Sequence, residues 1–410
     1  MNLQSRHHSQ IQKLIQIFSE MGPNDGPLDR KLQKFFRKNK QFGSKDRKWT
    51  SAALYGYWRW FGWLQKIEAE ELRLFCGYLL DGNEITPLIK DWALKLEVND
   101  KSIEELHALH PQDLDAKLSW MKKLIPELQI ADLNPEFTPS WPPELYAAFQ
   151  ERAGLWLRRQ GMGRAKLEDA LQEREIQYEI HPILPSAFCL QTRLQLTEFS
   201  PYQKGLIEVQ DLHSQLVGHI LNPGEGEKWL DLCAGAGGKA LHLASLTRPK
   251  GRILGLEIQE RMIQEARKRA TRGFFPNLEF RVWDGITLPT LPQPCDGVLV
   301  DAPCSGSGTW RRAPDLRWRT NKEDITKYNP TQLELLQQGA SQVKTGGILA
   351  YVTCSIFAEE NQNIIQTFLE SAPFDLEPFK DPLTGEECQG MKQYCPPQGD
   401  GIFIAKLRRQ

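Results

Sequence analysis

Apolar residues in the first third of the chain recur every three or four positions, as Ile11, Leu14 and Phe18 do. This spacing places them on one face of a helix, and the alternation typical of a strand is absent from residues 9–130. The stretch 49–61 is apolar nearly all round and carries three tryptophans, which favours a buried central helix over a surface that stacks on bases. The pattern therefore predicts a helical bundle at the start of the chain.

A cluster of prolines follows the predicted bundle, and proline stops helices and stiffens connections. Beyond it, residues 145–222 mix short helices with β-like runs and end in a predicted helix over 212–221. The prolines of the cluster are Pro135, Pro139, Pro142 and Pro143. We therefore expect an all-helical domain over 1–134, a small α+β subdomain over 144–222 and a larger domain over 223–410.

After Glu225, short apolar runs of strand length alternate with stretches of helical periodicity. Such alternation predicts right-handed βαβ units and a doubly wound, mostly parallel sheet of the Rossmann-like α/β class. The closing run 401–407 follows no helix and is predicted to add an antiparallel edge strand. The predicted strands cover 229–233, 252–257, 278–283, 297–301 and 347–353, and the predicted helices 239–246, 259–272, 331–343 and 359–371.

The bulk composition is that of an ordinary globular protein: of 410 residues, 40% are hydrophobic and 25% are charged. No run approaches the roughly 18 apolar residues that a membrane helix needs, and the first residues lack the apolar core of a signal peptide. The eight cysteines form no CxxC pair and no disulfide framework, which predicts reduced thiols and no zinc site. We expect a monomeric cytoplasmic protein with no membrane and no metal.

The net charge of −1 hides an uneven distribution. Residues 28–50 contain nine Lys and Arg against two Asp, a local net charge of +7, and Phe35, Phe36, Phe42 and Trp49 are interleaved with them. Such a cluster is suited to following a phosphate backbone. A solvated helix face explains it equally well, so charge alone leaves both interpretations open.

A glycine loop joins the first predicted strand of the larger domain to its helix. Gly235, Gly237 and Ala240 satisfy the dinucleotide-binding fingerprint, and Glu257 lies at the distance expected of an acid that binds a ribose. The same pattern suits S-adenosylmethionine as well as a nicotinamide dinucleotide, because both place an adenosine over the first strands. The fingerprint alone therefore does not decide the cofactor.

Acidic residues at the ends of the predicted strands favour one of these cofactors. Asp231, Asp284 and Asp301 join Glu257 along one edge of the sheet. Such a rim would repel a pyrophosphate but would suit the sulfonium and ammonium groups of S-adenosylmethionine. Any one of these acids has the alternative role of capping the following helix, although this is a weaker explanation for all four.

Two cysteines, Cys304 and Cys354, each follow an apolar strand, and they should be neighbours if these sequential strands pair. Beside a methyl donor, a thiolate suits methylation at carbon 5 of a pyrimidine, because it adds reversibly to carbon 6. Asp301 is placed to hydrogen-bond N3, and Lys239 to lower a thiol pKa or steady a phosphate. Cys233 is expected to be structural within the glycine loop, and small buried apolar roles are expected for Cys76, Cys189, Cys295, Cys388 and Cys395.

Long motifs in residues 150–410 resemble the Sun/Nop-type RNA cytosine-5 methyltransferases. The resemblance rests on the run 301–319, DAPCSGSGTWRRAPDLRWR, together with Thr353-Cys354-Ser355. It extends to Val209-Gln210-Asp211, the glycine loop, Glu359-Glu360-Asn361 and Asp400-Gly401-Ile402-Phe403.

This resemblance implies a role for each site residue. Cys354 would be the nucleophile that adds to carbon 6, and Cys304 would assist release of the methylated RNA. Glu257 would bind the ribose, Asp284 would lie beside the adenine, and Asp301 would lie in the active site. The cofactor loop would comprise Cys233, Ala234, Gly235, Ala236, Gly237, Gly238 and Lys239.

The helical segment is similar to the NusB-like RNA-binding domain of the RsmB-like bacterial branch. The similarity rests on Gly43-Ser44-Lys45-Asp46-Arg47 and on Leu54-Tyr55-Gly56-Tyr57-Trp58-Arg59, and it implies that the +7 cluster binds RNA. One departure is Gly235-Ala236, where the family usually has Ala-Pro, which predicts a more flexible cofactor loop and weaker cofactor binding. Arg261 follows Glu257 by four residues rather than the usual five, so it is left out of the site.

The sequence therefore predicts an S-adenosylmethionine-dependent methyltransferase that forms 5-methylcytosine in structured RNA, with ribosomal RNA as the expected substrate. Phosphates near the target base would be held by Arg311, Arg312, Arg317 and Arg319. Two alternatives remain. A NAD-dependent oxidoreductase fits the glycine loop but leaves Cys304 and Cys354 without a role, and a non-catalytic RNA-binding or ribosome-assembly protein fits the basic cluster.

Overall fold

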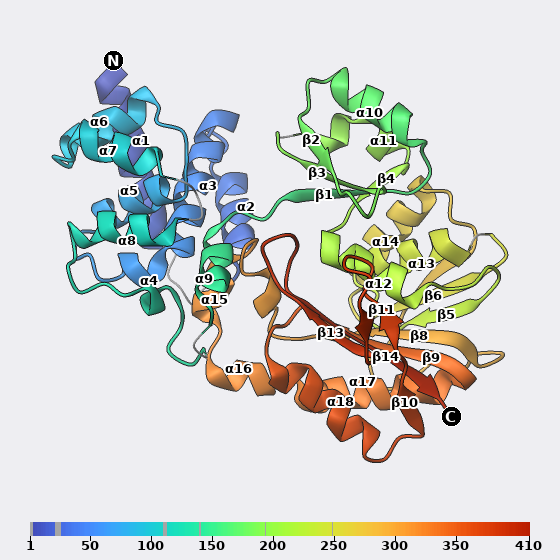
Figure 1. Ribbon diagram of the computed structural model, residues 1–410. Coiled ribbons are helices and arrows are strands. Elements are labelled where there is room, and N and C mark those ends of the chain that lie inside the picture. The colour runs from blue at the N-terminus through green and yellow to red at the C-terminus, as the bar shows by residue number, and fades with distance from the viewer. Residues whose placement is uncertain (1–2, 21–25, 110–112, 139–140, 193, 248) are drawn as a thin grey trace. The chain divides into compact units, whose positions relative to one another are not determined.

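The computed structural model describes residues 3–20, 26–109, 113–138, 141–192, 194–247 and 249–410 (Figure 1). The chain forms two compact units, of which the first comprises residues up to Arg152 together with Thr309–Lys322. The second comprises Ala153–Gly308 and Glu323–Gln410. The segment Thr309–Lys322 therefore leaves the second unit, joins the first and returns. The three-part division at 1–134, 144–222 and 223–410 stays a prediction, and Pro139 of the proline cluster lies outside the described residues.

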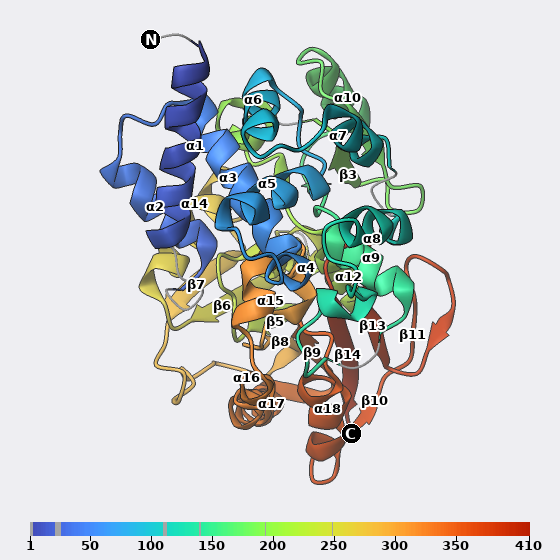
Figure 2. The ribbon, with the colours of Figure 1, turned by 90° about the vertical axis from the view of Figure 1, so that its left-hand side faces the viewer.

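The first unit is helical, as the apolar spacing predicts. Its central helices α3 and α5 lie side by side in Figure 2. They can pack this closely because Gly77 has no side chain: a Cβ there would lie 2.7 Å from Tyr57 Cα. The helices are α1 Leu3–Glu20, α2 Leu28–Lys38, α3 Ser44–Arg59, α4 Phe61–Leu64, α5 Glu70–Leu80, α6 Pro87–Lys95, α7 Asp100–His107, α8 Leu114–Lys122, the 3-10 turn η1 Ile130–Leu133, α9 Pro143–Gln150 and α15 Pro314–Arg319.

Aromatic side chains form much of the core of this unit. Trp58 and Trp60 are buried, and Trp63 and Trp92 join them. The prediction that the stretch 49–61 is a packed core element, rather than a platform for stacking bases, is confirmed for Trp58 and Trp60, and Trp49 is half-buried. Burial of such large apolar surfaces is what stabilises a bundle built of short helices.

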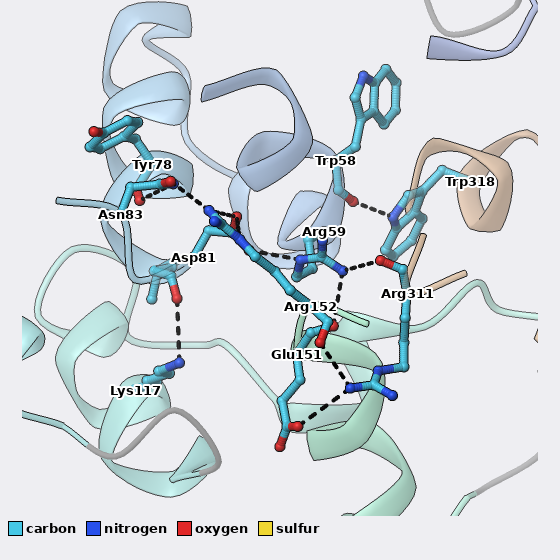
Figure 3. A network of polar contacts seen from close by, with 11 residues as sticks. Trp58, Arg59, Tyr78, Asp81, Asn83, Lys117, Glu151, Arg152, Arg311 and Trp318 are labelled. Carbon is cyan, nitrogen blue, oxygen red and sulfur yellow. Dashed lines mark hydrogen bonds and ion pairs between the residues drawn. The ribbon is translucent and has the colours of Figure 1, made fainter. Parts of the chain in front are cut away.

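A buried polar network ties α3, α5 and the connection after α9 to the segment Thr309–Lys322 (Figure 3). The Asp81 carboxylate, whose side chain is only 1% exposed, accepts hydrogen bonds from Arg59 Nε at 2.7 Å and Arg152 Nη2 at 2.6 Å. Arg59 Nη1 also donates to the backbone oxygens of Glu151, at 3.1 Å, and Arg311, at 2.9 Å. Arg311 Nη2 in turn donates to the backbone oxygen of Arg152 at 2.9 Å.

Helix α15 is held in the helical unit by further long-range hydrogen bonds. Trp318 Nε1 donates to the backbone oxygen of Trp58 at 2.9 Å, and the backbone N–H of Leu28 donates to Asp315 Oδ2 at 3.0 Å. Both donors are groups that cost free energy when they are buried without a partner. The segment is therefore an integral part of the helical unit.

The second unit contains a small sheet, a large sheet and a two-stranded sheet formed by β11 and β12. The small sheet is antiparallel, in the order β2-β3-β1-β4. Its elements are β1 Leu155–Arg159, α10 Arg164–Gln172, β2 Tyr178–Ile180, β3 Ala187–Leu190, η2 Leu196–Glu198, α11 Ser200–Gln203 and β4 Ile207–Val209. Arg269 and Arg272, on α14 Glu260–Arg272, bond to the buried Glu208 of β4 and so join the small sheet to the large one.

The large sheet has the order β10-β14-β9-β8-β5-β6-β7, and its strands β7, β6, β5, β8 and β9 are parallel. This is the predicted doubly wound Rossmann-like sheet. β13 also pairs with β14, and β11 and β12 pair only with each other. The elements of this part of the chain are α12 Leu212–Leu221, β5 Lys228–Asp231, α13 Gly238–Thr247, β6 Arg252–Glu257, β7 Leu278–Val282, β8 Cys295–Asp301, η3 Ser307–Thr309, α16 Lys322–Thr326, α17 Asn329–Gln342, β9 Val343–Thr353, η4 Ala358–Glu360, α18 Gln362–Leu369, β10 Phe374–Leu376, β11 Phe379–Lys380, β12 Glu387–Cys388, β13 Met391–Tyr394 and β14 Ile402–Arg409.

Helices cover both faces of the large sheet. Alternate residues of β8 point to opposite faces, so that Leu299 packs with the cluster containing α12, α13 and α14. Val298 and Val300 pack with the cluster containing α17 and α18, which lie below the sheet in Figure 1. A strand buried on both faces explains the continuous apolar run that precedes Asp301.

The last strand differs in one respect from its prediction. β14 pairs antiparallel with β9, as expected, but it is not an edge strand, because β10 and β13 pair along its other side. β10 is three residues long and β13 reads Met-Lys-Gln-Tyr, so neither carries the apolar alternation by which a strand is recognised. No helix in the described ranges is long and apolar enough to cross a membrane.

We expect Asp81→Asn to destabilise the helical unit, because it removes the charge that compensates the buried Arg59 guanidinium. Loss of one partner of a buried ion pair should lower the free energy of unfolding by about 3 kcal/mol. Urea unfolding followed by tryptophan fluorescence measures it, since most tryptophans lie in this unit. The exposed Glu104 provides a control, and Glu104→Gln should change the stability by less than about 0.5 kcal/mol. Equal effects of the two substitutions would contradict the role given to Asp81.

Candidate active site

The loop after β5 is shaped by glycines at the carboxyl edge of the parallel strands, where ligands bind in open α/β sheets. Gly237 has φ +84°, and a Cβ there would lie 2.8 Å from Phe280 Cζ. Gly235 also has a positive φ, +52°, but no atom lies within 4 Å of where its Cβ would be. The loop is therefore tightly packed at Gly237 and open at Gly235.

Two of the predicted acids make local backbone contacts. Glu257 accepts hydrogen bonds from the backbone N–H of Gly235, at 3.0 Å, and of Gln259, at 2.9 Å. It thus links the glycine loop to the start of α14. Asp284 is exposed and accepts from two N–H groups of its own turn, Thr287 and Ile286, which lower its pKa. The alternative role of capping backbone N–H groups thus accounts for the observed contacts of Glu257 and Asp284.

Asp231 and Asp301 form the inner part of the acidic edge. Asp231 is buried, and its Oδ1 accepts from the Cys233 N–H at 3.3 Å while its Oδ2 has no hydrogen-bond partner. Burial, reinforced by the charge of Asp301, raises its pKa to about 8. Lys239 Nζ contacts Asp301 Oδ2 at 2.7 Å. Lys239 compensates the charge of Asp301, and Glu257 and Asp284 add further negative charge to this edge, so the site favours a cationic ligand.

The two cysteines are in contact, as the expected pairing of their strands implies. Asp301 of β8 pairs with Val352 of β9, and the turns that follow bring Cys304 Sγ to 3.3 Å from Cys354 Sγ. A backbone hydrogen bond from Gly308 N to Cys354 O, 2.8 Å long, joins the two turns. The thiols are thus close enough to share a proton.

The charged groups around the two thiols have opposite signs. The hydrogen bond with Cys354, burial and the charge of Glu360 together raise the pKa of Cys304 well above its usual value. Burial opposes the charged form of Lys239, but Asp301 outweighs it and raises the pKa of Lys239, whose ammonium also interacts with Cys354. Cys304 therefore lies beside an anion and Cys354 beside a cation. A cation stabilises a thiolate and an anion stabilises a thiol.

Comparison with known proteins identifies the family. Residues 218–408 match the family model described as 16S rRNA methyltransferase RsmB/F. The chain is 32% identical over 320 residues to the ribosomal RNA small subunit methyltransferase B of Yersinia pestis bv. Antiqua (strain Angola), covering 77% of this chain and 68% of that protein. The chain belongs to the RsmB/F methyltransferase family. As a member, it is an S-adenosylmethionine-dependent RNA methyltransferase, which rules out the oxidoreductase and the non-catalytic RNA-binding protein.

Solved structures share the fold of this RsmB/F-family chain. The crystal structure of PH0851 superposes with a TM-score of 0.71 at 22% identity, covering 97% of each chain. A methyltransferase homolog protein from Pyrococcus horikoshii gives a TM-score of 0.57 at 25% identity, covering 80% of this chain and 100% of that one. The Sun/Nop-type resemblance seen in the motifs is confirmed by the family match and by the relative from Yersinia pestis.

One group of predicted RNA contacts is corrected by the structure. Arg311 and Arg317 are buried in the helical unit, where Arg317 lies against the rings of Phe149, Trp310 and Trp318. Arg319 is largely buried and pairs with Asp315 at 3.0 Å. The prediction that Arg311 and Arg317 hold RNA phosphates is therefore wrong, because their guanidinium groups support the packing of Thr309–Lys322. Arg312 is exposed.

Of the five other cysteines expected to be buried, three are buried, one is half-buried and one is exposed. Cys76, Cys295 and Cys388 are buried, as predicted, and Cys189 is half-buried. Cys395 is exposed, so its predicted core role is wrong, because it lies in the loop that follows β13. Burial, with the nearby acids, raises the pKa of Cys233 well above its usual value, which suits an unreactive thiol. In the described part of the chain, no three His, Cys, Asp or Glu side chains are grouped to hold a metal.

We expect Asp231→Asn to remove a pH-dependent loss of stability. In the unfolded chain this carboxyl ionises near its ordinary pKa of 3.8, whereas in the folded methyltransferase it stays protonated until about pH 8. The folded state thus binds more protons within this window, so stability falls as pH rises through it, by at most about 1.4 kcal/mol per pH unit. The melting temperature of Asp231→Asn minus that of the wild type should therefore increase from about pH 5 to about pH 8 and then level off.

Thermal melts at a series of pH values measure this difference. The exposed Glu173 lies in the same unit, and Glu173→Gln should give a difference that does not change across the window. A pH-independent difference for Asp231→Asn would show that the buried carboxyl does not titrate as described.

Proposed function

We propose that this RNA methyltransferase converts a cytosine of small subunit ribosomal RNA to 5-methylcytosine, with Cys354 as the nucleophile. The observation that carries the proposal is the contact between Cys304 and Cys354 at 3.3 Å, with charges of opposite sign beside the two thiols. Carbon 5 of cytosine is a poor nucleophile until a group adds to carbon 6, and a thiolate suits that reversible addition. The ammonium of Lys239 interacts with Cys354 and the carboxylate of Glu360 with Cys304, and we therefore assign Cys354 as the residue that adds.

The carboxyl edge of the sheet fits S-adenosylmethionine. Its excess of acids over Lys239 and the unpartnered Oδ2 of Asp231 suit a ligand that carries a sulfonium and an ammonium group. When bound, the cofactor supplies the methyl group that carbon 5 accepts. Glu257 would hold the ribose and Asp284 would lie on the adenine side. The loop residues that would surround the cofactor are Cys233, Ala234, Gly235, Ala236, Gly237, Gly238 and Lys239.

Addition of Cys354 activates the base. A bond forms between Cys354 Sγ and carbon 6, and the electron pair of the C5=C6 bond moves to carbon 5. Negative charge develops in the ring and N3 takes up a proton from water, while Asp301, which pairs with Lys239 at 2.7 Å, accepts a hydrogen bond from the protonated N3. The polar groups thus lower the cost of making carbon 5 nucleophilic.

Cys304 assists release of the methylated base. The proton on carbon 5 leaves to water, the C5=C6 bond re-forms, and the bond between carbon 6 and Cys354 breaks with its electron pair on the sulfur. The Cys304 thiol, 3.3 Å from Cys354, donates a hydrogen bond to the departing thiolate. N3 returns its proton to water. The raised pKa of Cys304 suits this role, because only the protonated thiol can donate.

We expect opposite outcomes when each thiol is removed. Cys304→Ala should add to RNA and methylate it but release it slowly, so that a covalent protein–RNA adduct accumulates. Cys354→Ala should form no adduct and transfer no methyl group. A denaturing gel of enzyme incubated with radiolabelled methyl donor and ribosomal RNA separates these cases. Cys395→Ser, at an exposed thiol, should behave as the wild type, and methylation by Cys354→Ala would refute the assignment.

Binding of ribosomal RNA is supported by the surface of the helical unit. Exposed Arg37, Lys40 and Arg47 border a hollow of about 680 Å³ that Gln33 and Phe36 also line. Cations around an aromatic ring suit RNA, which offers phosphates and stacking bases. The relative from Yersinia pestis is named for its action on small subunit ribosomal RNA, and we assign the same substrate class here.

We expect bisulfite sequencing to locate the product. In cells that contain the protein, one cytosine of small subunit ribosomal RNA should resist conversion, and it should be converted in cells that lack the protein. Complementation with the wild type should restore resistance, whereas Cys354→Ala should not. Resistance that appears only in transfer RNA would overturn the choice of substrate but not the chemistry.

We also propose that the enzyme acts as a monomer in the cytoplasm. Two thiols 3.3 Å apart are easily joined in an oxidising compartment, and the mechanism needs both as thiol and thiolate. None of the eight cysteines, all of which lie in the described ranges, forms a disulfide. Sedimentation equilibrium of the purified protein tests the monomeric state.

A further inference from the structure

The turn that carries Cys304 is held by a buried acid outside the reacting groups. Glu360 lies in the 3-10 turn η4 and has no exposed surface. Its Oε1 accepts the backbone N–H of Ser305 at 2.8 Å, and its Oε2 accepts the Ser305 hydroxyl at 2.6 Å. Both carboxylate oxygens therefore accept hydrogen bonds from Ser305, the residue that follows Cys304.

The next residue holds the other cysteine turn. Asn361 is also fully buried; its Oδ1 accepts the Thr353 hydroxyl at 2.5 Å, and its Nδ2 donates to the Ser355 backbone oxygen at 3.0 Å. Thr353 and Ser355 flank Cys354. Two consecutive side chains thus hydrogen-bond to the neighbours of both thiols: Glu360 to the turn of Cys304, and Asn361 to the turn of Cys354. The sequence offers Glu359-Glu360-Asn361 as part of a family motif but gives no indication of this division.

Further contacts make the support continuous. Gln332 Nε2, on α17, donates to the Pro303 backbone oxygen at 2.9 Å and lies 3.4 Å from Glu360 Oε1. The hydroxyls of Ser307 and Ser355 meet at 3.1 Å, which ties the two turns directly. The 3.3 Å between the sulfurs is thus set by a hydrogen-bonded frame.

The charge of Glu360 needs an explanation beyond packing. The hydrogen bonds to its carboxylate come from neutral groups, and burial raises its pKa despite them. Burying a carboxylate among neutral donors costs free energy that a neutral glutamine would largely avoid. The same charge acts on Cys304, where it favours the protonated thiol. The free-energy cost of burying the Glu360 carboxylate therefore accompanies a stabilisation of the protonated Cys304 thiol.

We propose that Glu360 is a positioning residue for release of the product: its carboxylate fixes the turn of Cys304 and keeps that thiol aimed at Cys354 as the hydrogen-bond donor. The inference rests on the proposed function, because it assumes that Cys304 assists the departure of Cys354. It adds that this assistance depends on a carboxylate that touches neither RNA nor cofactor. Glu360 acts through Ser305 and through its charge.

The test is Glu360→Gln, with Glu359→Gln as the matched control. Glu359 is the exposed neighbour on the same turn, so its substitution removes the same charge and leaves both cysteine turns intact. In Glu360→Gln, the amide oxygen can still accept the Ser305 N–H, but the amide nitrogen cannot accept the hydroxyl and carries no charge. We expect kcat to fall about tenfold or more, with KM for RNA unchanged, and the covalent adduct to accumulate between the levels of wild type and Cys304→Ala.

Adduct accumulation separates positioning from loss of fold. A variant that is merely less folded would lose turnover and adduct together. Ser305→Ala provides a second route, because it deletes only the hydroxyl that donates to Glu360 Oε2, and it should accumulate adduct to a smaller extent. Thermal melts of each variant report the folded fraction.

The outcomes are distinct. If Cys304→Ala accumulates adduct but neither Glu360→Gln nor Ser305→Ala does, the role of Glu360 is refuted and the proposed function stands. If Cys304→Ala itself accumulates none, the proposed function fails and this inference fails with it. Wild-type turnover in Glu360→Gln would also overturn the positioning role.

Discussion

The parallel pairing of β8 and β9 is the constraint on which the site depends. Because parallel strands end at the same edge of a sheet, the turns after Asp301 and Thr353 meet, although Cys304 and Cys354 are 50 residues apart along the chain. The register of these strands pairs Val300 with Tyr351 and Asp301 with Val352, and the side chains of Val300, Tyr351 and Val352 are buried in the core. The contact between the thiols is thus a consequence of core packing.

Charge then makes two equivalent-looking thiols unequal. A pair of cysteines in contact shares a proton, and nothing in their own chemistry decides which sulfur keeps it. The ammonium of Lys239, which is paired with Asp301 at the carboxyl edge of the sheet, interacts with Cys354. The carboxylate of Glu360, in η4, interacts with Cys304. The proposed division between attacking and releasing thiol therefore rests on where the fold places one cation and one buried anion.

Sequence patterns predicted those parts of the molecule whose cause is local. Strand and helix periodicity gave the sheet, and the apolar runs before Asp301 and Cys354 gave the neighbouring thiols. The misassigned residues depend on long-range packing. A sequence pattern counts Arg317 as a polar surface residue, whereas in the structure it is buried among aromatic rings and supports their packing. Glu360 precedes a helix, where an acid is ordinary, so its contacts with a residue 55 positions away leave no periodic signal.

The junction at Gly308 shows how the site and the helical unit share one stretch of chain. Gly308 N donates to Cys354 O, and Gly308 O accepts from Gly401 N, both at 2.8 Å. A Cβ on Gly308 would lie 2.0 Å from Gly401 O, so this crossing requires glycine. Thr309, the next residue, already belongs to the helical unit. The backbone is thus clamped beside the reacting thiols immediately before it enters the bundle, so the position of Cys304 is set by contacts within its own unit rather than by the segment that follows.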